Sequence, residues 1–212
     1  MPFRRLKVNT YRRTLITTAG AATLAPLLKG WADDAPQGGK ITQGSKLVMS
    51  SFTSDYVMPG ASWRGFSDRV MGGISNAELN SANIGGKNSI RLSGNVTRES
   101  NGGFIQMALY FGQDYAEFDG SDYKGVELLV YGNNEDYNVH VRTSDCGWHD
   151  ESYRMTFFAK PEWQRIRIPW DSFKANQVTA PLDSARLQRI AILGWMREFE
   201  ADISLAEIAL YS

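Results

Sequence analysis

The sequence is poor in the residues that most catalytic and metal-binding sites use. Among its 212 residues it has one cysteine, Cys146, and two histidines, His140 and His149. A single cysteine excludes a disulfide within the chain, and these three side chains offer little for a zinc site, which needs three or four ligands. There is also no phosphate-binding glycine loop, no nucleophile elbow and no Ser/His/Asp arrangement that spacing supports. We therefore expect a non-enzymatic protein with no cofactor and no bound metal.

An excess of positive charge is missing as well. The formal net charge is zero, but residues 1–32 hold six basic residues and no acidic one. The remainder of the chain then has 17 basic and 23 acidic residues, a net charge of about −6. Because nucleic-acid binding requires many phosphate neutralisations, this charge and the absence of a basic stripe along the sequence argue against a nucleic-acid partner.

Residues 1–32 have the pattern of an export signal. A basic start leads to the pair Arg12-Arg13, an apolar run follows, and Gly30-Trp31-Ala32 fits a cleavage site. The paired arginines fit the twin-arginine route, with an ordinary secretory signal as the alternative. An uncleaved anchor is disfavoured because the apolar run is short and contains Pro26. We expect a periplasmic protein with no stable membrane span in its mature chain.

Residues 33–46 are polar and glycine-rich, which predicts a linker. From residue 47 onward, short apolar alternations separated by turn residues predict about nine or ten strands, and hence a single all-β sandwich domain over residues 47–212. Valines alternate with polar residues in 138–142, which predicts a strand with one buried and one polar face. The dipeptide Asn101-Gly102, between two apolar runs, predicts a β-hairpin. The clearest expected strands are 90–96, 104–111, 126–130, 138–142, 154–159, 163–169, 190–193 and 203–210.

The most distinctive stretch runs from Trp63 to Ser75. It places Asp68-Arg69 just before Gly72-Gly73, and it has enough apolar side chains to pack down, so we predict a folded, pinned loop rather than a core strand. Two interpretations remain open. Asp68 and Arg69 either face a partner or ligand, or they hold the fold together through a backbone cap and an internal ion pair.

This stretch, together with Asn101-Gly102-Gly103-Phe104 and the segments 123–126, 141–143 and 163–170, resembles the complex I intermediate-associated protein of 30 kDa family. The resemblance covers about residues 47–211. It implies a jelly-roll β-sandwich of the galactose-binding-like type and transfers no catalytic residues. It also implies a role as an assembly factor for NADH:ubiquinone oxidoreductase, here a scaffold or chaperone for a protein complex in the envelope. The mitochondrial relatives act on the matrix side, whereas this chain is expected to be exported.

The candidate partner- or ligand-binding residues come from the Trp63 stretch, from the Asn101 turn and from a loop near Cys146. They are Trp63, Asp68, Arg69, Met71, Gly72, Gly73, Ser75, Asn101, Gly103, Arg142, Asp145 and Trp148.

Three further clusters each admit a functional and a structural interpretation. Large aromatics can stack on sugars, as in a carbohydrate-binding module for envelope glycans, or cover the edges of the core. Cys146 and His149 can share a metal or form a thiolate–imidazole pair, or lie in a polar loop with an incidental thiol. An acidic loop can hold calcium or simply be solvated. The aromatic candidates are Trp148, Tyr153, Trp163, Trp170 and Trp195, and the acidic ones are Asp114, Glu117, Asp119 and Asp122.

Overall fold

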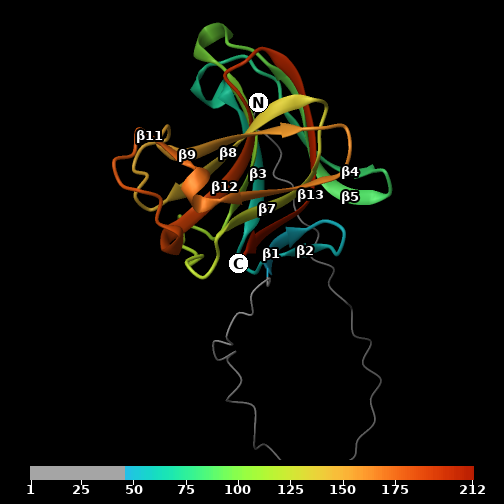
Figure 1. The fold of residues 1–212 in the computed structure, drawn as a ribbon. Coiled ribbons are helices and arrows are strands. Elements are labelled where there is room, and N and C mark those ends of the chain that lie inside the picture. Colours follow the sequence, from blue (N-terminus) through green and yellow to red (C-terminus); the bar gives the residue numbers. More distant parts are fainter. Residues whose placement is uncertain (1–45) are drawn as a thin grey trace, which may run out of the picture. The chain divides into compact units, whose positions relative to one another are not determined.

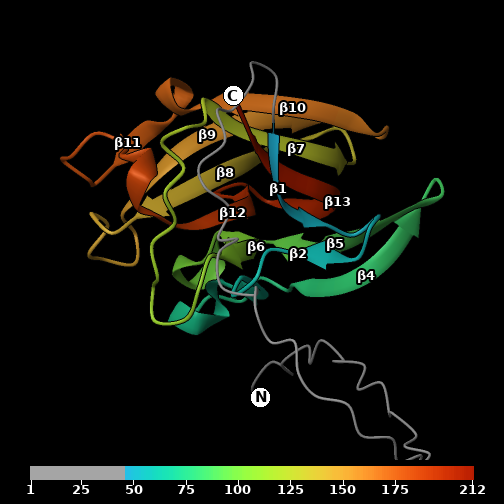
Figure 2. The same cartoon turned by 90° about the horizontal axis from the view of Figure 1, so that it is seen from below.

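The computed structural model describes residues 46–212, which fold into two antiparallel β-sheets (Figures 1 and 2). The predicted export signal, 1–32, and the predicted linker up to residue 45 lie outside the described residues. The strands are β1 (Lys46–Ser51), β2 (Tyr56–Val57), β3 (Ser62–Ser67), β4 (Glu78–Ile84), β5 (Lys87–Val96), β6 (Phe104–Tyr110), β7 (Gly125–Tyr131), β8 (Glu135–Thr143), β9 (Ser152–Ala159), β10 (Gln164–Pro169), β11 (Lys174–Asn176), β12 (Leu187–Trp195) and β13 (Phe199–Tyr211). Four short 3₁₀ turns join them: η1 (Asp68–Met71), η2 (Glu99–Asn101), η3 (Trp170–Ser172) and η4 (Ser184–Arg186).

Sheet A is organised around β13, the longest strand. Its second half pairs with β7 on one side and β1 on the other, and its first half pairs with β5. Strands β10, β2 and β4 complete this sheet at its edges. Sheet B runs in the order β11-β9-β8-β12-β6-β3. The predicted all-β sandwich is therefore confirmed.

The main core lies between the sheets and follows from the two-residue period of the strands. Leu128 and Ile203 of sheet A, and Met107 and Ile192 of sheet B, are all 1% exposed or less. Burying one such side chain contributes about 1.5–3 kcal/mol of transfer free energy. A second, smaller apolar cluster lies on the other side of sheet B and contains Phe104, Ala108, Ala191 and Leu193.

Strand β8 shows why the second cluster matters. Val139 and Val141 face the main core, as the alternation predicted. The opposite face is polar, also as predicted, but it is not solvated: His140 is 4% exposed and Arg142 is 9% exposed. The side chains at the centre of this outer face are thus packed against one another and against the loop that Arg142 contacts.

The hairpin predicted at Asn101-Gly102 is wrong. Strand β5 belongs to sheet A and β6 to sheet B, so this connection crosses from one sheet to the other. Its glycines permit close packing instead of a tight turn, because a Cβ on Gly102 would lie 2.5 Å from Oδ2 of Asp68. The hairpin of this region is β4–β5, whose turn residues Gly85 and Gly86 both have positive φ, as a two-residue type I′ connection requires. It projects from the rest of the sheet in both views (Figures 1 and 2).

The Trp63 stretch is half strand and half loop. Residues Ser62–Ser67 form β3, the edge strand of sheet B beside β6, so the expectation of a loop is wrong for this part. An edge strand tolerates Gly65 and the polar residues because only one side of its backbone is paired and its outer side chains remain near solvent. From Asp68 onward the segment is a pinned loop, as predicted.

The outer face of sheet A carries charges of both signs that neutralise one another. Glu127, 3% exposed, accepts hydrogen bonds from Arg165 at 2.8 Å and Arg167 at 2.7 Å. Lys46 and Glu207 pair at 2.6 Å beside them. Burial raises the pKa of Glu127, but the hydrogen bond from Arg167 and the surrounding cations outweigh it and leave that pKa below its ordinary value. Along residues 46–212 no helix has the length and apolar content that a membrane crossing requires.

Candidate functional site

The Asp68 carboxylate is the centre of the family-like motif, and it is completely buried. Its Oδ1 accepts a hydrogen bond from the Ser75 backbone N–H at 2.9 Å, and its Oδ2 accepts from the Ser75 hydroxyl at 2.5 Å. The same Oδ2 accepts from the backbone N–H groups of Gly103 at 2.6 Å and Phe104 at 3.2 Å. The carboxylate therefore connects its own loop, 68–75, with the loop that leads into β6 at Gly103 and Phe104. The structural interpretation holds for Asp68.

The neighbouring motif residues serve the same connection. Gly72 ends η1 in the left-handed region with φ 93°, where a glycine is favoured. Ser75 Oγ accepts from the Thr97 backbone N–H at 3.0 Å. Arg69 donates from Nε to the Ser75 carbonyl at 3.0 Å, so the predicted internal partner is a carbonyl instead of a carboxylate. Trp63 donates from Nε1 to Ser50 Oγ at 3.0 Å and packs on the main core.

Beyond Asp68, the exposed side chains of the motif are apolar apart from Arg69. The exposed fractions are 64% for Val70, 51% for Met71 and 46% for Ile74. Met196, 46% exposed, lies nearby because its backbone N–H donates to the Gly103 carbonyl at 2.6 Å. We call these four residues the apolar tip.

The second predicted set, Arg142 with Asp145 and Trp148, does not converge on one ligand. The Arg142 guanidinium donates to the Trp148 carbonyl at 2.6 Å, the Glu151 carbonyl at 2.7 Å and the Cys146 carbonyl at 2.9 Å, so it holds the loop 144–151 against sheet B. Asp145 pairs with Arg186 at 2.6 Å, away from Arg142. Trp148 is 72% exposed and its ring is presented outward from this loop.

The remaining clusters are mostly structural in their contacts. Trp163 and Trp170 donate their indole N–H groups to the Ile84 and Tyr123 carbonyls. Tyr153 is 1% exposed. Cys146 is buried, whereas His149 is exposed. Within residues 46–212 no three His, Cys, Asp or Glu side chains are grouped closely enough to hold a metal ion.

The outer face of sheet B, opposite the main core, brings together residues from six strands. Strand register sets them in rows across the sheet. Two adjacent rows form what we call the cationic half: Arg142 of β8, Arg189 of β12 and Tyr110 of β6 in one row, and Lys174 of β11, Arg154 of β9, His140 of β8 and Arg64 of β3 in the other. The next rows form the aromatic half: Phe66 of β3, Phe104 of β6, Trp195 of β12 and Phe158 of β9, with Gln106, Asn138 and Asp136 among them.

The side chains of this face contact one another through rings and cations. Phe104 lies between Phe66 and Trp195, with ring centroids 6.3 and 5.8 Å away. The guanidinium of Arg154 lies 4.6 Å from the Trp195 ring centroid, and that of Arg64 lies 4.5 Å from the Tyr110 centroid. Each such cation–π contact is worth about 0.5–2 kcal/mol. Because Arg154 belongs to the cationic half and Trp195 to the aromatic half, their contact joins the two halves into one surface.

Tyr110 and His140 are surrounded by cations. Arg189 donates from Nη1 to the Tyr110 hydroxyl at 3.0 Å. Two polar atoms of this face are buried without a hydrogen-bond partner, His140 Nε2 and Arg189 Nε. Burial, and then the charges of Arg154 and Arg189, lower the pKa of His140 to about 3. His140 is therefore neutral at any ordinary pH.

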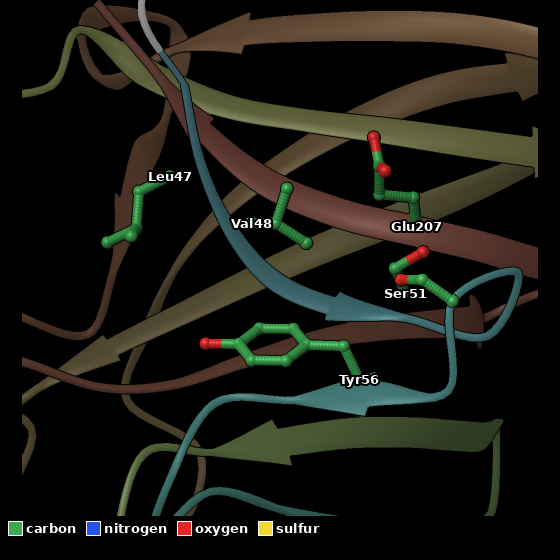
Figure 3. A pocket seen from close by; sticks show the side chains of 6 residues that line it. Leu47, Val48, Ser51, Tyr56 and Glu207 are labelled. Carbon is green, nitrogen blue, oxygen red and sulfur yellow. The ribbon is translucent and has the colours of Figure 1, made fainter.

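A shallow depression of about 520 Å³ lies on sheet A, between β1 and β2 (Figure 3). Val48 and Tyr56 line its two sides, and Glu207 is its one charged residue. Glu207 is already paired with Lys46 and Arg165. The depression thus offers little unpaired polarity to a ligand.

The fold is shared with β-sandwich carbohydrate-binding modules. The family 11 module of the cellulosomal cellulase Lic26A-Cel5E of Clostridium thermocellum is similar at 13% identity, over 81% of this chain and 96% of that chain, with a TM-score of 0.64. A family 11 module of the same organism in complex with a β-1,3-1,4-mixed-linked tetrasaccharide gives 11% identity over 81% and 98%, with a TM-score of 0.62. A family 30 carbohydrate-binding module gives 14% identity over 79% and 89%, with a TM-score of 0.54. At these identities the similarity concerns the fold alone.

The chain belongs to the Complex I intermediate-associated protein 30 (CIA30) family, whose model matches residues 51–203. This confirms the resemblance seen in the sequence. A search of curated proteins found no match.

Sequence reasoning found the Asp68 motif but missed most of the outer face of sheet B. Arg64, Arg154 and Arg189 were not among the predicted site residues, and Trp195 was considered only as a possible sugar-stacking ring. The expected strand 154–159 held a usable signal, because a two-residue period puts Arg154 on the same face as Thr156 and Phe158. The order of strands in the sheet was needed to see that the arginines meet.

Replacing Gly73 with alanine tests the structural role of the motif. The new Cβ would contact Asp68 Cγ and lie 2.5 Å from its Oδ1, so we expect the free energy of unfolding in urea to fall by about 1–3 kcal/mol. Gly147→Ala is the control, because the nearest atom to its Cβ would be 3.8 Å away, and its effect should stay within about 0.5 kcal/mol. Equal stabilities of the two variants would contradict a pinned loop.

The buried imidazole of His140 predicts a loss of stability in mild acid. Its pKa is lowered in the folded state, so the unfolded chain takes up a proton first as the pH falls from about 6.5 toward 3. Between pH 7 and pH 5 this should cost about 2 kcal/mol of unfolding free energy. Urea unfolding of His140→Gln should show that much less dependence on pH, whereas the exposed His149→Gln should behave as the unmodified protein. Parallel pH dependence of all three proteins would exclude this role for His140.

Proposed function

We propose that this domain is a non-catalytic binding domain that holds a sugar chain against the outer face of sheet B. The observation that carries the proposal is the aromatic half of that face, where the partly exposed rings of Phe66 and Trp195 pack on the buried ring of Phe104 and Phe158 is 48% exposed. Aromatic rings flanked by hydrogen-bonding side chains suit sugars, which have apolar C–H faces and a rim of hydroxyl groups.

The dimensions of the face fit an extended ligand. Six strands about 4.8 Å apart give a surface about 24 Å across, the scale of a short oligosaccharide. Trp148 supplies a further exposed ring beside it, on the loop that Arg142 attaches to this sheet. The tetrasaccharide complex of the family 11 module, which has a similar fold, supports a glycan as the class of ligand.

We further propose that this binding takes place in the periplasm. The support is the twin-arginine pattern of residues 1–32. A glycan ligand there would belong to the cell envelope.

Removing the Trp195 ring tests the sugar-binding proposal. We expect Trp195→Ala to weaken binding to oligosaccharides about tenfold or more, because a stacked ring contributes about 1.5 kcal/mol. Calorimetry against a glycan panel that includes a mixed-linked β-1,3-1,4 tetrasaccharide measures this, with melting curves to check folding. Tyr56→Ala, an exposed ring on sheet A, is the matched control. Loss of binding in Tyr56→Ala but not in Trp195→Ala would place the ligand on sheet A instead of sheet B and refute the proposal.

The apolar tip favours a second function, a scaffold that holds a protein partner during assembly of an envelope complex. Val70, Met71 and Ile74 expose apolar side chains on a loop whose backbone is fixed by Asp68, and fixed apolar side chains favour protein contacts because little conformational entropy is lost on binding. Membership of the CIA30 family also supports this function.

Charges placed on the tip test the scaffold. Met71→Glu combined with Ile74→Glu should abolish co-purification of a specific partner from the periplasmic fraction, whereas Val57→Glu on β2, similarly exposed, should leave it intact. Identical sets of co-purifying proteins for both variants would count against a docking role for the tip.

A further inference from the structure

Within residues 46–212, the outer face of sheet B gathers arginines that form no ion pair, although Asp150 and Glu151 lie close enough to act on Arg154 and Arg142. Among residues 46–212, Arg91, Arg165, Arg167, Arg186 and Arg197 each form an ion pair. None of the ion pairs found there involves Arg64, Arg142, Arg154 or Arg189, although these four lie in two adjacent rows of one sheet. Arg69 and Arg98 also lack an ion pair in this part of the chain, but the cationic half is where four such arginines lie on one face.

Sheet A shows what an ion-paired face of this protein looks like. There Glu127 and Glu207 lie between Lys46, Arg165 and Arg167, and each of these three cations has a carboxylate within 3.5 Å. In the two rows of the cationic half on sheet B, the residues between the cations are His140, Tyr110, Ala108 and Ala191, and none is a carboxylate. The carboxylates nearest to this half are at its margins, where Asp150 and Glu151 lie on the flanking loop, and Asp136 lies at the far end of the aromatic half.

The cationic side chains are not equally committed to internal contacts. Arg142 uses its guanidinium on three carbonyl groups of the loop 144–151. Arg64 is exposed and contacts only the Tyr110 ring among the interactions found. Arg189 has an Nε–H with no acceptor, and beside it His140, 4% exposed, has Nε2 with no partner. Two nitrogen atoms, Arg189 Nε and His140 Nε2, therefore lack a hydrogen-bond partner in the part of the face where the charges of Arg154 and Arg189 act on His140.

Repulsion and burial make this arrangement unfavourable without an anion. Burial lowers the pKa of Arg142 and of Arg154, and the charge of Arg189 adds to the lowering at Arg142. Arg154 donates from Nε to Ser152 Oγ and from Nη2 to the Asp150 carbonyl, both at 2.8 Å, which leaves its Nη1 without an acceptor among residues 46–212. Arg64 has no hydrogen bond within the same residues, so its guanidinium can bind a carboxylate or sulfate in the planar, two-bond geometry that arginine forms with these groups.

We propose that the ligand of this face is an acidic sugar chain, whose carboxylate or sulfate groups lie over Arg64, Arg154 and Arg189 while its sugar rings lie on the aromatic half. This inference rests on the proposed function and specifies its class of ligand. Because the cationic rows and the aromatic rows are adjacent and parallel, one extended chain with charged groups along one edge contacts both.

Paired polymers of matched length test the charge requirement. Calorimetry should detect binding of oligogalacturonate, with a dextran sulfate oligomer as the sulfated arm, and at least tenfold weaker binding of neutral galactan and dextran oligomers. Raising sodium chloride from 50 to 300 mM should weaken the acidic ligands severalfold, since exposed charge pairs are screened. The ratio of carboxylated to sulfated affinity decides which anionic group the face prefers.

Single arginine substitutions locate the charge. Arg64→Gln should weaken oligogalacturonate binding about tenfold, and Arg64 is exposed, so the variant should fold normally. Arg154→Gln and Arg189→Gln should do the same, with melting temperatures as a check. The matched control is Arg98→Gln, because Arg98 is exposed and also absent from the ion pairs but lies after β5 in sheet A.

The outcomes separate this inference from the proposed function. Equal affinity for neutral and acidic oligomers, unaffected by Arg64→Gln, would overturn the charge requirement and leave sugar binding intact. Stabilisation by inorganic sulfate that Arg64→Gln abolishes, with no binding of any sugar, would retain an anion site but refute a glycan ligand. Tighter binding of oligothymidylate than of every sugar would overturn the proposal in favour of nucleic acid.

Discussion

The structure depends on one buried carboxylate that joins loops leaving both sheets. Asp68 follows β3 of sheet B, and its donors come from Ser75, on the way to sheet A, and from Gly103 and Phe104, where the chain enters β6. A hydrogen bond to a charged group contributes about 1.5–3 kcal/mol, and a buried charge without its donors costs more than that. The order of the motif therefore meets a geometric requirement. Gly73 leaves room for the Asp68 carboxylate, as Gly102 does from the other loop, and the Ser75 hydroxyl bridges that carboxylate to Thr97.

The hydrogen bonds of Asp68 also fix the position of a residue on the outer face of sheet B. Phe104 is held at its backbone by Asp68, and its ring contacts both Phe66 and Trp195. Trp195 in turn contacts His140 with ring centroids 4.9 Å apart, and Arg154 lies over it. A shift at the Asp68 loop would thus reach the aromatic half directly, whereas the cationic half is supported by strand pairing and by the loop that Arg142 holds.

The parts of this structure that were predictable are those decided by local pattern. Two-residue alternation identified strands such as 126–130 and 190–193, and the distinctive order around Asp68 led to the family. The hairpin at Asn101-Gly102 failed because an Asn-Gly pair specifies a conformation but not which sheet the next strand joins. The arginines of sheet B could not be assembled because they are separated by up to 125 positions in sequence, and only the register of five strands places them in neighbouring rows. Nor does a sequence report that Arg165 and Arg167 of sheet A are ion-paired while Arg64, Arg154 and Arg189 of sheet B are not.

The family motif and the proposed binding surface therefore have different roles: the motif stabilises the fold, and the surface is proposed to bind the ligand. Apart from the exposed apolar tip, the motif around Asp68 is buried or involved in backbone contacts, so a substitution at Asp68, Gly73 or Ser75 changes stability whatever the ligand is. The outer face of sheet B contributes little that folding requires at Arg64, which is exposed, or at Phe158, which is half exposed. Retaining unpaired arginines beside a neutral, buried imidazole lowers stability, since like charges repel and unused donors remain desolvated. Such an arrangement is best explained by a ligand that supplies the missing negative charge, because side-chain pairing on sheet A shows that this fold accommodates neutralising carboxylates between its strands without difficulty.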